Sequence, residues 1–272
     1  MICQSEDRAI YDDFIRSLCM EGERTRPVGE LMLDVGKYFL GFPYASNTLE
    51  RQGRETLVIN LRGFDCFTFV ENVVALAWMI REDKAHFRDY AAQLKKIRYR
   101  HGLSKGYSSR LHYFTDWLYD NERKGILKNV TRRSGGEPFR KNFNFMTSHR
   151  EKYPALSMEK SYREMMTIEK RLSARIMHHI TKAALVKFED MVEQGDLIAI
   201  TTDIKGLDVI HVGFAVRLRS RIHLLHASEV EKRVVISHVT LRQYLLKRKM
   251  MTGIMIGRLI PPYQNDGSPS SS

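Results

Sequence analysis

Apolar residues in the first two thirds of the chain recur at the three- and four-residue spacing of helices that face a core. Pro27 suits the first turn of one such helix, and Gly41 with the following Pro43 ends it. The spacing predicts a helix that begins after Asp65 and others over residues 7–20, 27–40, 85–97, 111–122 and 159–176. The β-branched residues 56–61 are predicted as a short strand that leads into the helix after Asp65. Residues 131–145, with Gly and Pro among polar residues, are predicted as an ordered loop or surface excursion.

From about Gly195 onward the pattern changes to short apolar runs separated by turn residues. This pattern predicts an antiparallel sheet with strands at residues 196–202, 209–217, 222–228, 233–237 and 253–260, and a short basic helix at 240–249. Helices followed by a sheet indicate the α+β class, in which the helix after Asp65 packs against the later sheet. We predict one domain over residues 1–265, with helical additions at about 1–40 and 80–180, and a disordered tail at 266–272.

The composition fits a globular protein with an anionic partner or an anionic working surface. Of the 272 residues, 43% are hydrophobic and 10% aromatic, and the net charge is +12 with a pI near 9.6. Nucleic acid, phospholipid and bacterial cell wall all qualify as partners. No zinc-finger, helix-turn-helix or RNA-binding aromatic pattern accompanies the basic clumps, which argues against nucleic acid and favours solvated faces. These clumps are Lys95, Lys96, Arg98 and Arg100, then Arg132 and Arg133, then Arg217, Arg219 and Arg221.

The chain as written contains neither a spanning helix nor a signal peptide. No run reaches the roughly 18 uncharged apolar residues of a membrane span, and the N-terminus lacks basic and apolar leader regions. Three cysteines, Cys3, Cys19 and Cys66, are too few for a disulfide framework, and no clustered Cys and His spacing suggests a metal site. Cys3 and Cys19 can pair in an oxidising compartment, which leaves Cys66 as the odd thiol.

Cys66 lies where a helix is expected to activate a thiol. Asp65 is a good N-cap, so Cys66 falls in the first helical turn, where the helix dipole favours thiolate over thiol. Thiolate is the form that attacks a carbonyl carbon. The simpler alternative is a small buried thiol at the top of a core helix.

A cysteine nucleophile needs a base, and two of the ten histidines lie inside apolar strands. His211 is followed closely by Gly213, whose missing side chain permits close approach by another group. If the strands of His211 and His226 are neighbours, the two rings lie side by side as a base and its orienting group. Alternatively, each is a satisfied core histidine. The remaining histidines considered are assigned surface or packing roles: His86, His101, His112, His149, and the adjacent pair His178 and His179.

Three segments of the chain resemble the bacterial N-acetylmuramoyl-L-alanine amidase-like family, a branch of the NlpC-type papain-like cell-wall hydrolases. These are FDCFTFVE around Cys66, GDLIAITTDIKGLDVIHVGFAV around His211, and LLHAS at His226, and the resemblance runs from about residue 27 to 259. It implies a papain-like fold in which Cys66 is the nucleophile, His211 the general base and His226 the group that orients it.

The resemblance also points to residues of a substrate cleft. Tyr44 in GFPY matches a tyrosine that lines the cleft, and Asp65 matches the aspartate before the cysteine, where an N-cap role is equally expected. Arg62, Thr68 and Asp208 belong to the matching segments and are assigned to the cleft or to packing. Glu71 belongs there too, or is a solvated helix position. Residues 131–175 are a further candidate for part of the cleft.

The activity implied is acyl transfer without metal or cofactor, on the amide that joins N-acetylmuramic acid to L-alanine. Muropeptides, including their 1,6-anhydro form, are the expected substrates. Phe67 and Thr68 stand where the superfamily commonly has Ser and Gly, which favours the amidase branch. A stem-peptide endopeptidase and a non-catalytic wall- or nucleic-acid-binding protein are the alternatives. The expected location is the periplasm or cell envelope, with cytoplasmic recycling of wall fragments as the alternative.

Overall fold

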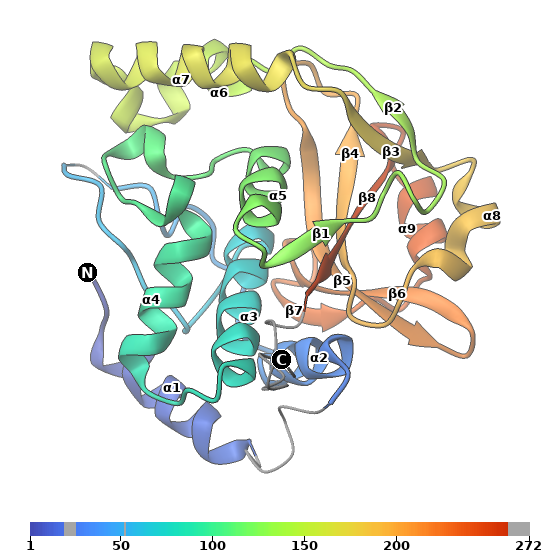
Figure 1. Ribbon diagram of the computed structural model, residues 1–272, viewed down its shortest axis with the longest axis horizontal. Coiled ribbons are helices and arrows are strands. Elements are labelled where there is room, and N and C mark those ends of the chain that lie inside the picture. Colours follow the sequence, from blue (N-terminus) through green and yellow to red (C-terminus); the bar gives the residue numbers. More distant parts are fainter. Residues whose placement is uncertain (19–25, 52, 261–272) are drawn as a thin grey trace, which may run out of the picture.

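The long helices lie to one side of an antiparallel sheet (Figure 1). The structure is a computed structural model that describes residues 1–18, 26–51 and 53–260. The long helices are α1 (Ser5–Ser17), α2 (Val28–Tyr38), α3 (Cys66–Arg81), α4 (Phe87–Arg98), α5 (Phe114–Arg123) and α7 (Glu159–Ser173). Three short helices, α6 (Phe145–Ser148), α8 (Leu185–Phe188) and α9 (Leu241–Leu246), complete the set within the described ranges.

Every strand pairing in the described part of the chain is antiparallel. The order across the sheet is β2-β3-β8-β4-β5-β6-β7, and β1 pairs with β8 beside this path. The strands are β1 (Leu127–Asn129), β2 (Glu137–Phe139), β3 (Met177–Thr181), β4 (Leu197–Thr202), β5 (Val209–Leu218), β6 (Arg221–Ser228), β7 (Arg233–Ile236) and β8 (Met251–Leu259). Strands β4 to β8 all follow the six long helices, in keeping with the α+β prediction, whereas β1, β2 and β3 are interspersed with helices.

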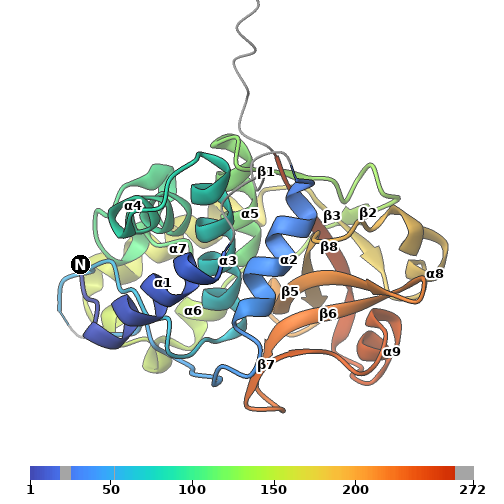
Figure 2. The ribbon, with the colours of Figure 1, turned by 90° about the horizontal axis from the view of Figure 1, so that it is seen from below.

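α3 is the central helix and it packs on one face of the sheet, as Figure 2 shows from below. Its residues 68–80 are all buried, and the ring of Phe69 meets that of Phe214 on β5 at 5.8 Å. Because side chains alternate along a strand, Ala215 faces the opposite side, where a second apolar cluster includes Leu241 and Leu245 of α9. The sheet is therefore covered on both faces near β5 and β6.

The predicted long helices and the five predicted C-terminal strands are confirmed, with small shifts at their ends. The predicted strand at residues 56–61 is wrong, because this segment makes only an isolated bridge between Val58 and Ile2. Residues 131–145, predicted as a loop or surface excursion, contain β2, and β3 was not predicted. Both strands are short and are recognised only by their pairing with neighbouring strands. The end of the predicted helix 7–20 and the predicted tail at 266–272 lie outside the described residues, as does Cys19.

Candidate functional site

Cys66 is the first residue of α3, and local hydrogen bonds fix the helix start there. The backbone N–H of Thr68 donates to Asp65 Oδ1 at 2.7 Å, and the Asp65 N–H donates to Thr68 Oγ1 at 3.0 Å. This reciprocal capping box satisfies two N–H groups that would otherwise lack partners. The N-cap prediction for Asp65 is confirmed. As a residue, Cys66 is only partly buried.

The surroundings of Cys66 oppose the thiolate that the helix dipole favours. Burial, and to a smaller extent the charge of Asp65, raise the pKa of Cys66 to about 12. Backbone N–H groups of Val212, Cys66 and Phe67 act in the opposite direction. The helix terminus contributes only about 0.3–2 kcal/mol, less than the cost of desolvating a thiolate here. A base must therefore remove the thiol proton.

His211 and His226 lie side by side on the β5–β6 hairpin. His211 Nε2 and His226 Nδ1 are 2.7 Å apart, and the two ring planes are perpendicular. Gly213 allows this approach, because a Cβ on it would lie 2.9 Å from the Cβ of His226. The prediction that these histidines are neighbours, with Gly213 providing the space, is confirmed.

Both imidazoles are neutral at neutral pH. Burial, then the neighbouring His226 and Arg248, hold the pKa of His211 well below its ordinary value, and burial lowers the pKa of His226 to about 4. The bond to His226 occupies Nε2 of His211, so Nδ1 is the ring nitrogen left to accept a proton. If His211 Nε2–H donates to His226 Nδ1, His211 Nδ1 carries the free lone pair.

Tyr244 of α9 packs against both histidines, a contact that sequence reasoning missed. Its ring stacks on His211 at 5.9 Å with planes 25° apart, and meets the ring of His226 edge-on at 5.5 Å. Burial raises the pKa of Tyr244, while the charge of Arg248 acts in the opposite direction. No motif marks this residue, because α9 is joined to the site only by folding.

Tyr44, which the resemblance assigns to the cleft, pairs with the segment that precedes α3. Burial and then the charges of Cys66 and Asp65 raise its pKa. Its backbone is held between two segments, with its N–H donating to Lys232 O at 2.9 Å and a bridge to Phe64. Tyr44 is therefore fixed beside the helix start.

Arg62 and Asp208 each make contacts that tie distant segments of the chain together. Arg62 Nε donates to Asp7 Oδ1 at 3.0 Å, which ties α1 to the segment before α3. Asp208 is buried, and its Oδ2 accepts bonds from the N–H and hydroxyl of Thr115 at 2.8 and 2.9 Å. The Asp208 contact joins the start of α5 to the start of β5, three residues before His211. The contacts of Arg62 and Asp208 thus give no support to a substrate-binding role.

Glu71 is not a solvated helix position, and Arg98 is not part of a solvated basic face. Arg98 Nε donates to Glu71 Oε2 at 2.7 Å, with side chains only 2% and 3% exposed. Arg98 Nη1 also donates to the carbonyl of Val58 at 2.5 Å. The pair therefore anchors α3 to α4 and to the segment that precedes the cysteine.

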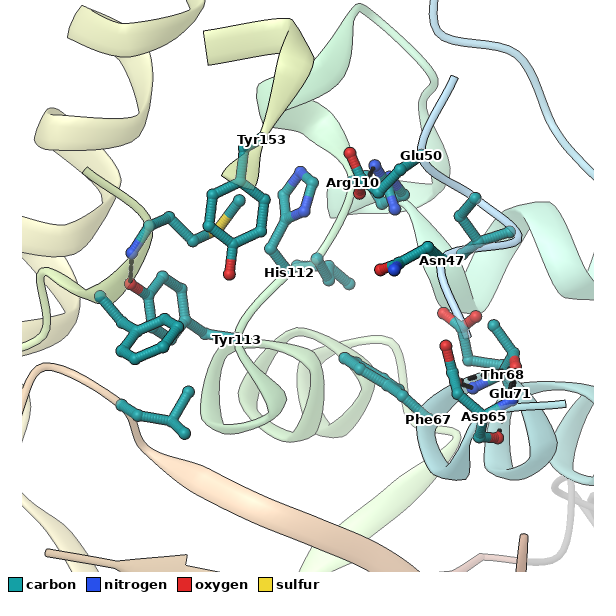
Figure 3. A pocket seen from close by; sticks show the side chains of 15 residues that line it. Asn47, Glu50, Asp65, Phe67, Thr68, Glu71, Arg110, His112, Tyr113 and Tyr153 are labelled. Carbon is teal, nitrogen blue, oxygen red and sulfur yellow. Dashed lines mark hydrogen bonds and ion pairs between the residues drawn. The ribbon is translucent and has the colours of Figure 1, made fainter. Parts of the chain in front are cut away.

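A pocket of about 710 Å³ opens beside the start of α3. Figure 3 shows Asn47, Phe67, His112 and Tyr153 around one space, with Arg110 and Glu50 paired at its edge. Asp65, Thr68 and Glu71 complete the wall on the α3 side. His112, set aside on sequence context, is thus a pocket residue. Phe145, Met146 and Tyr153 also line the pocket, as expected if residues 131–175 form part of a cleft.

The described residues present neither a metal cluster nor a membrane span. Within residues 1–18, 26–51 and 53–260, no three His, Cys, Asp or Glu side chains gather closely enough to hold a metal ion. No helix in these ranges is long and apolar enough to cross a membrane.

Comparison with known proteins decides the family. The sequence model of the AmiA-like family, described as N-acetylmuramoyl-L-alanine amidase-like, matches residues 34–254. The chain belongs to this family. Cys66, His211 and His226 all lie inside the matched range of the N-acetylmuramoyl-L-alanine amidase-like family. No curated protein matches the chain significantly.

Solved structures resemble the chain over most of its length. A protein from Bacteroides uniformis named N-acetylmuramoyl-L-alanine amidase is 39% identical, with 86% of this chain and 99% of that one covered and a TM-score of 0.82. A Bacteroides fragilis protein provisionally named a xylanase is 38% identical, with 84% and 100% covered and a TM-score of 0.80. A Legionella pneumophila protein, 20% identical, with 94% and 95% covered and a TM-score of 0.71, shares the fold.

Proposed function

We propose that the protein is a cysteine-dependent N-acetylmuramoyl-L-alanine amidase that acts on cell-wall muropeptides. The observation that carries the proposal is the His211–His226 pair, joined at 2.7 Å, on the β5–β6 hairpin that packs against the helix begun by Cys66. Family membership and the amidase name of the B. uniformis relative support an amide bond as the target. A papain-like fold of NlpC type is part of the proposal and is supported by the helix-start cysteine on an antiparallel sheet.

Because thiol and imidazole are both neutral at rest, the reaction begins with proton transfer. His211 Nδ1 takes the proton from Cys66 as the sulfur attacks the carbonyl carbon of the lactyl group on the sugar. The charged imidazolium then donates Nε2–H to His226, which keeps the ring in place. The C–N bond breaks as His211 returns the proton to the amine of L-alanine, and a muramoyl thioester remains on Cys66.

Hydrolysis of the thioester completes the cycle. Water attacks the same carbonyl carbon and gives one proton to His211, the S–C bond breaks, and the departing sulfur recovers that proton. In both half-reactions negative charge develops on the carbonyl oxygen. Backbone N–H groups of Cys66, Phe67 and Val212, which already favour charge at the sulfur, are the available donors at this position.

The wider setting follows from the substrate. Muropeptides arise at the cell envelope, so we infer action in the periplasm or at the envelope, with the 1,6-anhydro form of the sugar among the substrates. Cytoplasmic recycling of fragments is the alternative location. The net charge of +12 suits partners that carry carboxylates.

Product identification tests the function. Purified muropeptides are incubated with the protein, and the products are identified by mass spectrometry. Intact stem peptide together with free sugar supports the amidase. Stem peptide cut between D-glutamate and the diamino acid would instead show an endopeptidase, and a cleaved bond between the two sugars would show a glycosidase.

A further inference from the structure

We propose that the pocket lined by Asn47, Phe67, His112 and Tyr153 holds the sugar ring of the muropeptide, on the acyl side of the scissile amide. The inference rests on the proposed amidase function and assigns an orientation to its substrate. N-acetylmuramic acid supplies the carbonyl that Cys66 attacks, so its ring must lie within one lactyl group of the sulfur. Asp65, Phe67 and Thr68, which flank Cys66 in the chain, form one wall of this pocket.

Aromatic side chains give the pocket surfaces that suit a sugar ring. Phe67 points into the space (Figure 3), and its ring is fixed by edge-on contact with Phe114 at 5.2 Å. Tyr153 and Phe145 contribute two further rings to the lining. A pyranose presents C–H groups on its faces, which pack on aromatic rings, and polar groups around its edge.

Three polar groups are available for the edge of that ring. His112 Nε2 lies 2.9 Å from the carbonyl of Tyr107, which only accepts, so Nε2 carries the proton and Nδ1 is left as an acceptor. Burial holds the pKa of His112 well below its ordinary value, which keeps the ring neutral. The Asn47 amide and the Tyr153 hydroxyl also line the pocket, and within the described residues no other side chain or backbone group is hydrogen-bonded to them.

The charges of the pocket argue against the stem peptide, which carries several carboxylates. Arg110 is compensated by Glu50 at 2.7 Å and Glu55 at 3.4 Å, and the lining contains no other Lys or Arg. Cationic side chains line a separate pocket of about 750 Å³ instead, where Lys247 and Arg248 accompany His226. A neutral sugar is therefore the better occupant beside Phe67.

The test combines a truncated substrate with a substitution that spares the fold. Wild type is assayed on a muropeptide and on the matching D-lactoyl peptide, which keeps the scissile amide but lacks the sugar. Asn47→Gly removes the amide group, and glycine readily adopts the backbone φ of 58° at this exposed position. Ser220→Gly is the matched control, an exposed residue with φ of 67° in the β5–β6 turn.

We expect wild type to prefer the muropeptide in kcat/KM. Asn47→Gly is expected to lower that preference by about fivefold, the value of one hydrogen bond, while the lactoyl peptide is cut at an unchanged rate. Ser220→Gly is expected to leave both rates unchanged. Equal wild-type rates on the two substrates, or equal losses on both in Asn47→Gly, would overturn the assignment of the pocket.

Failure of the amidase function would be distinguishable. If neither substrate is cut at the lactyl–alanine bond, the proposed function is wrong. Calorimetry with the methylamide of N-acetylmuramic acid, which is neutral like the sugar of the substrate, then decides the pocket separately. Binding that Asn47→Gly weakens supports a sugar site, and absence of binding to wild type overturns it.

Discussion

Replacing Glu71 with Gln is expected to destabilise the protein strongly, although the side chain hardly changes shape. Glu71 and Arg98 are 3% and 2% exposed, and their charged atoms lie 2.7 Å apart. In Glu71→Gln, Arg98 keeps its bond to the carbonyl of Val58 but loses its counter-charge. A guanidinium does not give up its proton, so the variant buries an uncompensated charge.

The magnitude follows from the burial of the pair. Removing one partner of a buried ion pair costs about 3–5 kcal/mol of unfolding free energy, and since Gln retains one hydrogen-bond acceptor we expect about 3 kcal/mol. The reverse substitution, Arg98→Met, is expected to cost less. Burial raises the pKa of the Glu71 carboxyl, which can bind a proton and become neutral. The double variant should therefore recover part of the loss in Glu71→Gln.

Urea unfolding at neutral pH, followed by circular dichroism, measures these differences at constant m-value. Glu159→Gln is the matched control, because Glu159 and Arg163 form a pair of similar length, 2.8 Å, with side chains 58% and 75% exposed. Exposed pairs contribute about 0–1 kcal/mol. A loss in Glu71→Gln no larger than in Glu159→Gln would refute the reasoning from burial.

Three further predictions concern the site itself. His226→Ala should lower kcat on the order of 100-fold, because it removes the bond that orients His211. His226→Asn should retain more activity, since Oδ1 of asparagine takes the place of Nδ1. Equal losses in the two variants would contradict an orienting bond between His211 and His226. Iodoacetamide should label Cys66 slowly at neutral pH and about tenfold faster per pH unit above it, because its pKa is raised to about 12; rapid labelling at pH 7 would show a resting thiolate. The free energy of unfolding should be at its full value above about pH 6.5 and should fall as the pH is lowered toward 4, by about 1.4 kcal/mol per pH unit for His226 alone. The reason is that His226 binds a proton in the unfolded chain over this range, whereas the buried ring in the folded protein stays unprotonated. A urea midpoint that is independent of pH over this range would contradict the last prediction.

Local signals in the sequence predicted the main helices and strands of the fold. Asp65 and Thr68 are three residues apart, so the residues that form the capping box at the start of α3 all lie in one short segment of the sequence. The apolar runs of β5 and β6 likewise predicted the sheet, and the pairing of these two strands as neighbours predicted the contact between His211 and His226. These features depend on neighbours in the chain or on one hairpin.

What the sequence did not reveal depends on contacts between distant segments. The burial that raises the pKa of Cys66 comes from the whole assembled core, and it outweighs the helix dipole. Glu71 meets Arg98 across 27 positions of sequence, so a solvated face and a buried ion pair look alike in the pattern. His112 lines the pocket and Tyr244 contacts His211, but neither residue lies in a segment whose sequence pattern indicates a site.

The most direct test of the central claim is the release of intact stem peptide from muropeptides by Cys66→Ala, measured by mass spectrometry beside wild type. Cys3→Ala is the control, because Cys3 is another free thiol, at the N-terminus before α1. Loss of the nucleophile should lower the rate at least about 1,000-fold in Cys66→Ala and leave Cys3→Ala at the wild-type rate. Undiminished peptide release by Cys66→Ala would contradict a cysteine-dependent amidase.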